Sequence, residues 1–172
     1  MLQYYIGIDP GTSGALAVYT RTNDGPPAFV TALDLPVTVR ELASGKRRKR
    51  IDAPALYEIL RQFEPIASIT VEDVHARPNE GAVNAFSFGH TLGAVEAVAR
   101  IVCENVTQIT PQRWKAAYGI TADKGEARSL AQSLTGDQKR FRRVKDADAA
   151  EATLMALYGA LGGNVSHQGK AA

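Results

Sequence analysis

Four acidic residues lie where secondary-structure elements are expected to end or begin. Asp9 ends the first apolar run and precedes a Pro-Gly turn, and Glu72 ends a second β-rich run. Asp148 and Glu151 are three residues apart near the start of the last expected helix, so they lie side by side along the margin of its buried face. Adjacent carboxylates repel each other unless a cation or a proton separates them. A divalent metal ion bound between these two carboxylates would remove the repulsion.

The ligand type of this set favours Mg²⁺ or Mn²⁺ over zinc, because hard oxygen ligands occur here without a histidine or cysteine cluster. Two such ions, roughly 3.5 to 4 Å apart, can activate water on one side of a phosphodiester and stabilise the departing oxygen on the other. If Asp9, Glu72, Asp148 and Glu151 converge, the set predicts two-metal-ion phosphodiester hydrolysis. Taken singly, each acid also fits an ordinary role as a turn acid, a solvated loop acid or an acid at a helix N-terminus.

The elements that must position these acids follow a recognisable order. Three strands are predicted first, separated by turns rich in glycine and proline, and helices then alternate with two further strands. This order predicts a five-stranded mixed α/β sheet flanked by helices, the ribonuclease H-like arrangement. The expected strands are 4–9, 15–21, 28–35, 66–74 and 106–109, and the expected helices are a first one capped by Asp52, then 83–103, 111–118, 124–134 and 146–161.

Length and composition indicate one globular domain. The chain has 172 residues, 45% of them hydrophobic and 22% charged, which predicts a single domain over 1–161 followed by a disordered tail over 162–172. No stretch approaches the roughly 20 apolar residues of a membrane span, and no signal peptide is evident. The single Cys103 excludes an intramolecular disulfide, so a cytoplasmic location is expected.

Basic residues are concentrated in two clusters although the net charge is only +2. Lys and Arg contacts to phosphates supply most non-specific affinity for nucleic acid, so these clusters predict DNA binding if the acidic site lies between them. Solvated loops are the alternative reading. The two clusters are Lys46, Arg47, Arg48, Lys49 and Arg50, and then Lys139, Arg140, Arg142, Arg143 and Lys145.

Four segments resemble the successive blocks of RuvC-type Holliday junction resolvases, particularly those carried by phages: IGIDPGTSGALAVY, ITVEDVHARPNEGAVNAFSFGHTLGAVEAV, ITPQRWKAAYGI and KDADAAEATLMALYG. By this resemblance Asp9 matches the catalytic Asp of the first strand and Glu72 the mid-chain Glu. Asp148 and Glu151 match the final acidic pair, with Glu151 where many relatives carry Asp. The resemblance implies a Mg²⁺-dependent homodimer that nicks opposed strands of a four-way junction symmetrically and leaves 5'-phosphate and 3'-hydroxyl ends.

Residues outside the acidic set also have expected roles, some from the resemblance and some from their residue type. Lys115 and Lys124 lie where the family carries lysines that contact DNA, whereas Trp114 is expected in the core. Phe86 and Phe88 either pack the start of the long helix or act as wedges that unstack a base. His75 replaces an aromatic residue of the cellular relatives and is expected to be a polar surface or DNA-contacting residue.

Other functions remain open from the sequence. The opening turn also resembles the phosphate-binding turn of the actin, Hsp70 and sugar-kinase ATPases, but those proteins need two lobes of this kind. A nuclease acting on other branched DNA or on RNA/DNA hybrids would use the same metal chemistry. A non-catalytic module that binds branched DNA would normally have lost one acid. Asp146 is the alternative to Asp148 as a ligand, although it points away from the pair on a helix.

Overall fold

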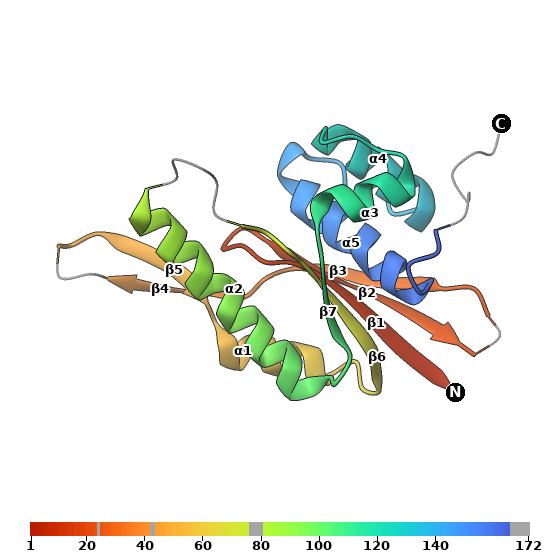
Figure 1. Ribbon diagram of the computed structural model, residues 1–172, viewed down its shortest axis with the longest axis horizontal. Helices are drawn as coiled ribbons and strands as arrows, with labels where there is room; N and C mark the ends of the chain where they lie inside the picture. Colours follow the sequence, from red (N-terminus) through yellow and green to blue (C-terminus); the bar gives the residue numbers. More distant parts are fainter. Residues whose placement is uncertain (24, 42–43, 76–80, 166–172) are drawn as a thin grey trace.

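The protein is built around a five-stranded mixed sheet (Figure 1). The computed structural model describes residues 1–23, 25–41, 44–75 and 81–165. The strands are β1 (Leu2–Asp9), β2 (Ala15–Thr22), β3 (Ala28–Asp34), β4 (Val37–Glu41), β5 (Arg47–Ile51), β6 (Ile66–Glu72) and β7 (Val106–Ile109). The sheet has the order β3-β2-β1-β6-β7, in which β1 is antiparallel to β2 and parallel to β6. The predicted ribonuclease H-like α/β fold is confirmed.

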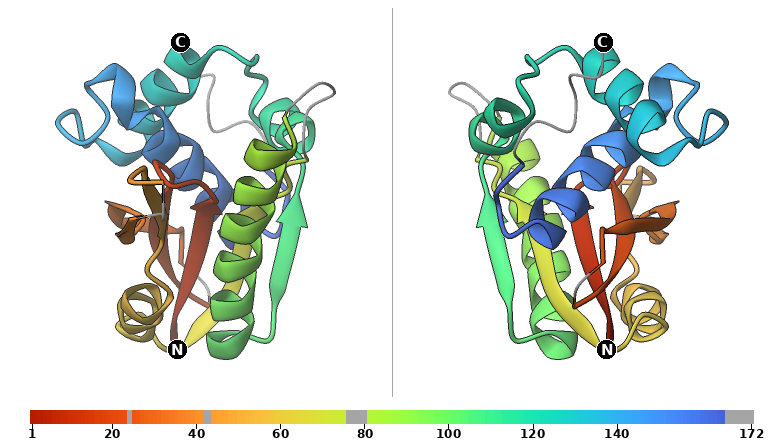
Figure 2. Two further views of the ribbon diagram at one scale, coloured as in Figure 1. Left: turned by 90° about the vertical axis from the view of Figure 1, so that its left-hand side faces the viewer. Right: turned by 90° about the vertical axis from the view of Figure 1, so that its right-hand side faces the viewer.

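Helices cover both faces of this sheet (Figure 2). They are α1 (Ala53–Arg61), α2 (Ala82–Val102), α3 (Pro111–Tyr118), α4 (Lys124–Thr135) and α5 (Ala147–Ala160). The alternation of side chains along β2 serves both layers: Leu16 and Val18 join the core beneath α1 and α2, whereas Ala15 and Ala17 pack against α5. The small side chains on the second face let α5 lie close to the sheet.

The closest approach of helix and sheet is at Gly7 of β1. A Cβ atom added at Gly7 would collide with the main chain of α5 at Ala152 and Ala156. Only glycine fits here, because the space that a side chain would need is taken by backbone atoms. The strand that ends at Asp9 and the helix that carries Asp148 are therefore in direct main-chain contact.

Two predicted helices agree closely with the structure. The Asp52 side chain accepts a hydrogen bond from the Ala55 amide at 3.1 Å, which confirms the predicted cap of α1. Helix α2 buries Val95, Val98 and Ala99 against the sheet, as its apolar spacing predicts.

The basic run of residues 46–50 includes a strand that the sequence did not predict, so the alternative reading of this run as a solvated loop is wrong. Four of the five basic residues belong to β5, which pairs with β4 in a separate antiparallel ribbon. Backbone hydrogen bonds hold this ladder, so charged side chains are compatible with it wherever they reach solvent. Within the ribbon Arg40 lies directly opposite Arg48, and Ile51 anchors the end of β5 in the core. Figure 1 shows the ribbon projecting beyond the main sheet near the N-terminal half of α2.

The C-terminal helix also differs slightly from its predicted bounds. A 3₁₀ turn at Val144–Asp146 leads into α5, and Gly162 and Gly163 follow its end with positive φ angles of 62° and 79°. Of the predicted tail over 162–172, the part from residue 166 onward lies outside the described residues. No helix within the described ranges is long and apolar enough to cross a membrane.

Candidate active site

Three of the four predicted acids converge at the end of β1. Asp9, Asp148 and Glu151 each offer one carboxylate oxygen, and these oxygens all lie within 4.8 Å of one another. Asp9 is the last residue of β1, and the other two lie in the first turns of α5. The contact of α5 with Gly7 helps to explain the meeting, because it holds the turn of α5 that begins at Ala152, next to Glu151, against the strand that ends at Asp9. Three oxygen ligands at this separation fit a divalent cation.

Glu72 is the neighbour of this group rather than a member of it. Strand β6 runs parallel to β1, with Val71 opposite Ile8, so Glu72 ends its strand beside Asp9. Its side chain is buried and accepts a hydrogen bond of 3.0 Å from the indole N–H of Trp114. The structure thus brings Glu72 to the same edge of the sheet, outside the 4.8 Å group of the other three acids.

Burial and neighbouring acids raise the pKa values of Asp9 and Glu72. Burial raises the pKa of Asp9 well above its usual value, and the negative charges of Glu72 and Asp148 raise it further. Burial also raises the pKa of Glu72, against the opposing effect of the hydrogen bond from Trp114. A bound cation would relieve both effects, because opposite charge favours the ionised carboxylates. Positive charge at the centre of the site would therefore stabilise the ionised forms of these acids.

Two lysines supply part of that charge. Lys115 Nζ lies 2.8 Å from Glu151 Oε1, and Lys124 Nζ lies 2.7 Å from Asp148 Oδ1 and 3.9 Å from Glu151 Oε2. Partial burial opposes the charge of Lys124, but its hydrogen bond to Asp148 and the nearby acids outweigh this and raise its pKa. Both lysines were expected to contact DNA, and the structure directs their amino groups at the acids.

Two side chains at the site were not singled out as functional in the sequence. Ser13 Oγ lies 3.4 Å from Asp148 Oδ2 and donates to it from the turn after β1. Trp114 is buried, as predicted, but its link to Glu72 spans 42 positions of the chain. Spacing along the sequence carries no signal for either contact.

Asp146 belongs to a different set of interactions. It is 2% exposed, accepts from the Arg143 amide at 2.7 Å and pairs with the guanidinium of Arg143 at 2.9 Å and of Arg140 at 3.5 Å. The hydrogen bonds from Arg143 lower its pKa. Asp148, and not Asp146, joins the acid cluster.

The predicted DNA-binding residues fall into two groups. Arg140 is engaged within the molecule, because it also bonds to the Ala32 carbonyl at 2.9 Å and to Asp34 at 2.7 Å. Arg50 lies 3.1 Å from the ring of His90 on α2. The exposed members are Lys46, Arg47, Lys49, Lys139, Arg142, Arg143 and Lys145, and Arg48 is half-buried.

The residues whose roles the sequence left open lie near the ends of β6 and α2. His75 is exposed, with its Nε2 3.5 Å from a carboxylate oxygen of Asp73. Phe88 is half-buried, whereas Phe86 is 68% exposed and does not pack in the core. Phe86 is therefore free to contact a partner.

The fold is that of a RuvC-type, ribonuclease H-like α/β protein. Among solved structures, the chain is similar to Thermus thermophilus RuvC in complex with a Holliday junction substrate, with a TM-score of 0.60 and 21% identity over 95% of this chain and 98% of that chain. A second structure of Thermus thermophilus RuvC matches with a TM-score of 0.58 and 24% identity, covering 94% and 97% of the two chains. No protein-family profile and no curated protein sequence matches the chain.

Proposed function

We propose that this protein is a metal-dependent endonuclease that resolves four-way DNA junctions. The observation that carries the proposal is the convergence of Asp9, Asp148 and Glu151 within 4.8 Å at one edge of a RuvC-type fold. The RuvC structure with the same fold is a complex with a Holliday junction, which makes this the first substrate to test.

The donor set of the site fits Mg²⁺ or Mn²⁺. All three clustered donors are carboxylates, and burial together with the negative charges of the neighbouring acids raises the pKa of Asp9. Glu72 adds a fourth carboxylate beside them, which suits a pair of ions. When bound, such ions polarise a water and the scissile phosphate, which is the chemistry that phosphodiester hydrolysis requires.

The residues of this chain have separate tasks in the proposal. Asp9, Asp148 and Glu151 hold the cation, and Glu72 is kept in orientation by Trp114. Lys115 and Lys124 neutralise the acids before DNA arrives, and Lys124, with its side chain 59% exposed, can turn from Asp148 to a phosphate of the substrate.

Exposed basic residues support the assignment of DNA as the substrate. Lys46, Arg47 and Lys49 lie on or beside the β4–β5 ribbon, and Arg142 and Lys145 shortly precede α5, whose first turns carry Asp148 and Glu151. A four-way junction brings several phosphate backbones close together, so it offers partners to both clusters at once. Arg140 is left out of this surface because its donors are used internally.

We also propose a homodimer, which paired symmetric nicks require. Helix α2 exposes Phe86, Gly93, Ala97 and Ile101 along one side, and Phe86 and Ile101 are 68% and 71% exposed. Apolar and small residues on an exposed helix face favour close packing against a second helix. The free, buried Cys103 suits the reducing cytoplasm in which we propose that the protein acts.

The test is cleavage of a synthetic four-way junction with each strand labelled in turn. We expect paired nicks in opposed strands with Mg²⁺, and none with EDTA. Asp148→Asn should abolish cutting while it retains junction binding, since the exposed basic residues are unchanged. Light scattering on the same preparation measures the proposed dimer.

Two comparison substrates and a measurement of junction binding separate the alternatives. A linear duplex of the same sequence should resist cutting. Cleavage of an RNA/DNA hybrid, with the junction left intact, would replace the proposal with a ribonuclease H activity. Tight junction binding without cleavage in Mg²⁺ or Mn²⁺ would indicate a non-catalytic module that binds branched DNA.

A further inference from the structure

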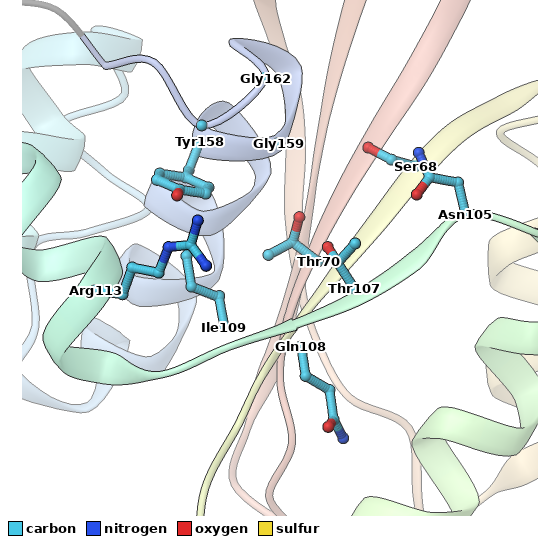
Figure 3. A pocket seen from close by; sticks show the side chains of 11 residues that line it. Ser68, Thr70, Asn105, Thr107, Gln108, Ile109, Arg113, Tyr158, Gly159 and Gly162 are labelled. Carbon is cyan, nitrogen blue, oxygen red and sulfur yellow. The ribbon is translucent and has the colours of Figure 1, made fainter.

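A polar cleft lies beside the C-terminal half of α5, away from the acid cluster (Figure 3). It has a volume of about 410 Å³ and is formed by β6, β7, α3 and the end of α5. None of the four acids and neither lysine of the candidate active site lines it. Tyr158, on its wall, is seven residues or about 10 Å along α5 from Glu151. We propose that this cleft binds a phosphate-bearing ligand of nucleotide size.

Hydroxyl groups from β6 form its floor. Thr70 is 2% exposed and Ser68 is 8% exposed, and neither hydroxyl has a hydrogen-bond partner among the residues that the structure describes. A Cβ atom at Gly159 would lie 2.7 Å from Thr70 Oγ1. The Thr70 hydroxyl therefore reaches the cleft because position 159 carries no side chain. The hydroxyl groups of Thr70 and Ser68 open into the cleft, where they can donate hydrogen bonds to a ligand that accepts them.

The charge of the cleft favours an anionic ligand. Arg113 is its one charged side chain, no acidic residue lines it, and Arg113 forms no ion pair within the described ranges. A guanidinium group binds phosphate oxygens through two parallel hydrogen bonds. In Figure 3, Arg113 extends from α3 toward the space that Thr70 and Thr107 face from the strands, whereas Gln108 points away.

The size and one wall of the cleft favour a nucleotide over a bare anion. Its volume falls within the range of small-molecule sites, roughly 300 to 1,000 Å³. The ring of Tyr158 lies beside the Arg113 guanidinium in Figure 3 and offers a flat apolar surface. Bases stack on such rings, so Tyr158 can hold a base while Arg113 holds its phosphate.

Helix α3 connects the cleft to the acids. Arg113 lines the cleft, the adjacent Trp114 donates to Glu72, and Lys115 pairs with Glu151. A ligand on Arg113 therefore acts on the same turn of helix that contacts the candidate active site. Trp114 is also the only tryptophan of the chain, so its fluorescence can report a change in α3 next to Arg113.

The test is a titration of the full chain with dAMP, followed by Trp114 fluorescence and by calorimetry. EDTA is present throughout, so that binding at the acid cluster through a metal does not contribute. We expect saturable binding that Arg113→Gln weakens at least tenfold and Thr70→Val weakens about fivefold. The matched control Arg61→Gln, at an exposed position of α1, should bind as the wild type does.

Parallel titrations identify the source of the phosphate. If a short oligodeoxynucleotide binds more tightly than dAMP, the natural ligand of the cleft is a nucleic acid strand. If dAMP binds more tightly, the natural ligand is a free nucleotide. Inorganic phosphate should bind more weakly than either. The proposal is overturned if dAMP shows no saturable binding by calorimetry, or if Arg113→Gln and Arg61→Gln bind it equally. Neither result bears on junction cleavage, which is measured with metal.

Discussion

Nε1 of Trp114 donates a hydrogen bond of 3.0 Å to Oε1 of Glu72, and both side chains are buried. The donor is neutral, so it orients the carboxylate without cancelling its charge. It joins α3 to the end of β6 and lies one residue from the Lys115–Glu151 ion pair. Helix α3 thus contacts two acids of the candidate active site, Glu72 through Trp114 and Glu151 through Lys115.

Trp114→Phe should weaken metal binding. The hydrogen bond from Trp114 lowers the pKa of Glu72, so its loss should raise that pKa further and move metal-dependent cleavage to higher pH. The loss of a residue that orients a metal ligand typically costs about 10- to 100-fold in affinity or activity. A Mg²⁺ titration of cleavage at several pH values measures both effects. An unchanged pH profile in a folded variant would contradict the role given to the indole.

Asp9→Asn should stabilise the metal-free protein at pH 8. Because the pKa of Asp9 is raised on folding, the folded protein holds its proton more tightly than the unfolded chain does. Stability without metal therefore falls as the pH rises through the raised pKa, and the asparagine variant escapes this loss. We expect a gain of about 1 kcal/mol in the free energy of unfolding, a typical value when functional strain is removed.

Urea denaturation in EDTA and in Mg²⁺ checks this. The wild type should gain stability from Mg²⁺, and Asp9→Asn should lose most of that gain. A variant that is less stable than the wild type at pH 8 in EDTA would contradict the prediction.

Asp146→Ala should lower the stability of the protein and leave its cleavage activity nearly unchanged. Asp146 is buried and hydrogen-bonded to Arg143, so its loss should cost about 2 to 3 kcal/mol at neutral pH. Since its pKa is lowered on folding, this contribution is present above the pKa of the unfolded chain and is lost as the pH falls through the folded value.

Cleavage by Asp146→Ala, measured below its unfolding temperature, should stay near that of the wild type. Asp148→Asn should show the reverse pattern, with cleavage lost and stability retained. Loss of cleavage in a folded Asp146→Ala protein would move the site away from Asp148.

Replacement of Arg47 and Lys49 by glutamine should weaken junction binding in a salt-dependent way. The two side chains are exposed and two residues apart on β5, so they lie on the same side of the ribbon. Each phosphate contact that is lost should reduce the slope of log K against log salt by about one. The double variant Arg61→Gln/Arg100→Gln, on the exposed sides of α1 and α2, is the matched control. Equal salt slopes for the two double variants would exclude the ribbon from the DNA-binding surface.

Local patterns predicted the main sheet and most helices well. Alternation along β2, the Asp52 cap and the apolar spacing of α2 each depend on residues a few positions apart, which a sequence displays directly. The β4–β5 ribbon was missed because its side chains are mostly charged, and its stability comes from backbone pairing that side-chain type does not reveal.

The acids of the site could be found, but their partners could not. Asp9 and Glu72 end strands, a position that the sequence indicates. The contacts of Lys115 with Glu151 and of Lys124 with Asp148 join segments 36 and 24 positions apart. Such contacts depend on how α3 and α4 pack against α5, which no short-range pattern specifies.

Gly7 limits which residues this part of the chain can accept. Because main-chain atoms of strand and helix touch there, any side chain at position 7 would push α5 away from β1 and spread the carboxylates of Asp9 and Glu151 apart. The small side chains of Ala15 and Ala17 permit the same close approach along β2. Divergence of this sequence should therefore be most restricted at these three positions.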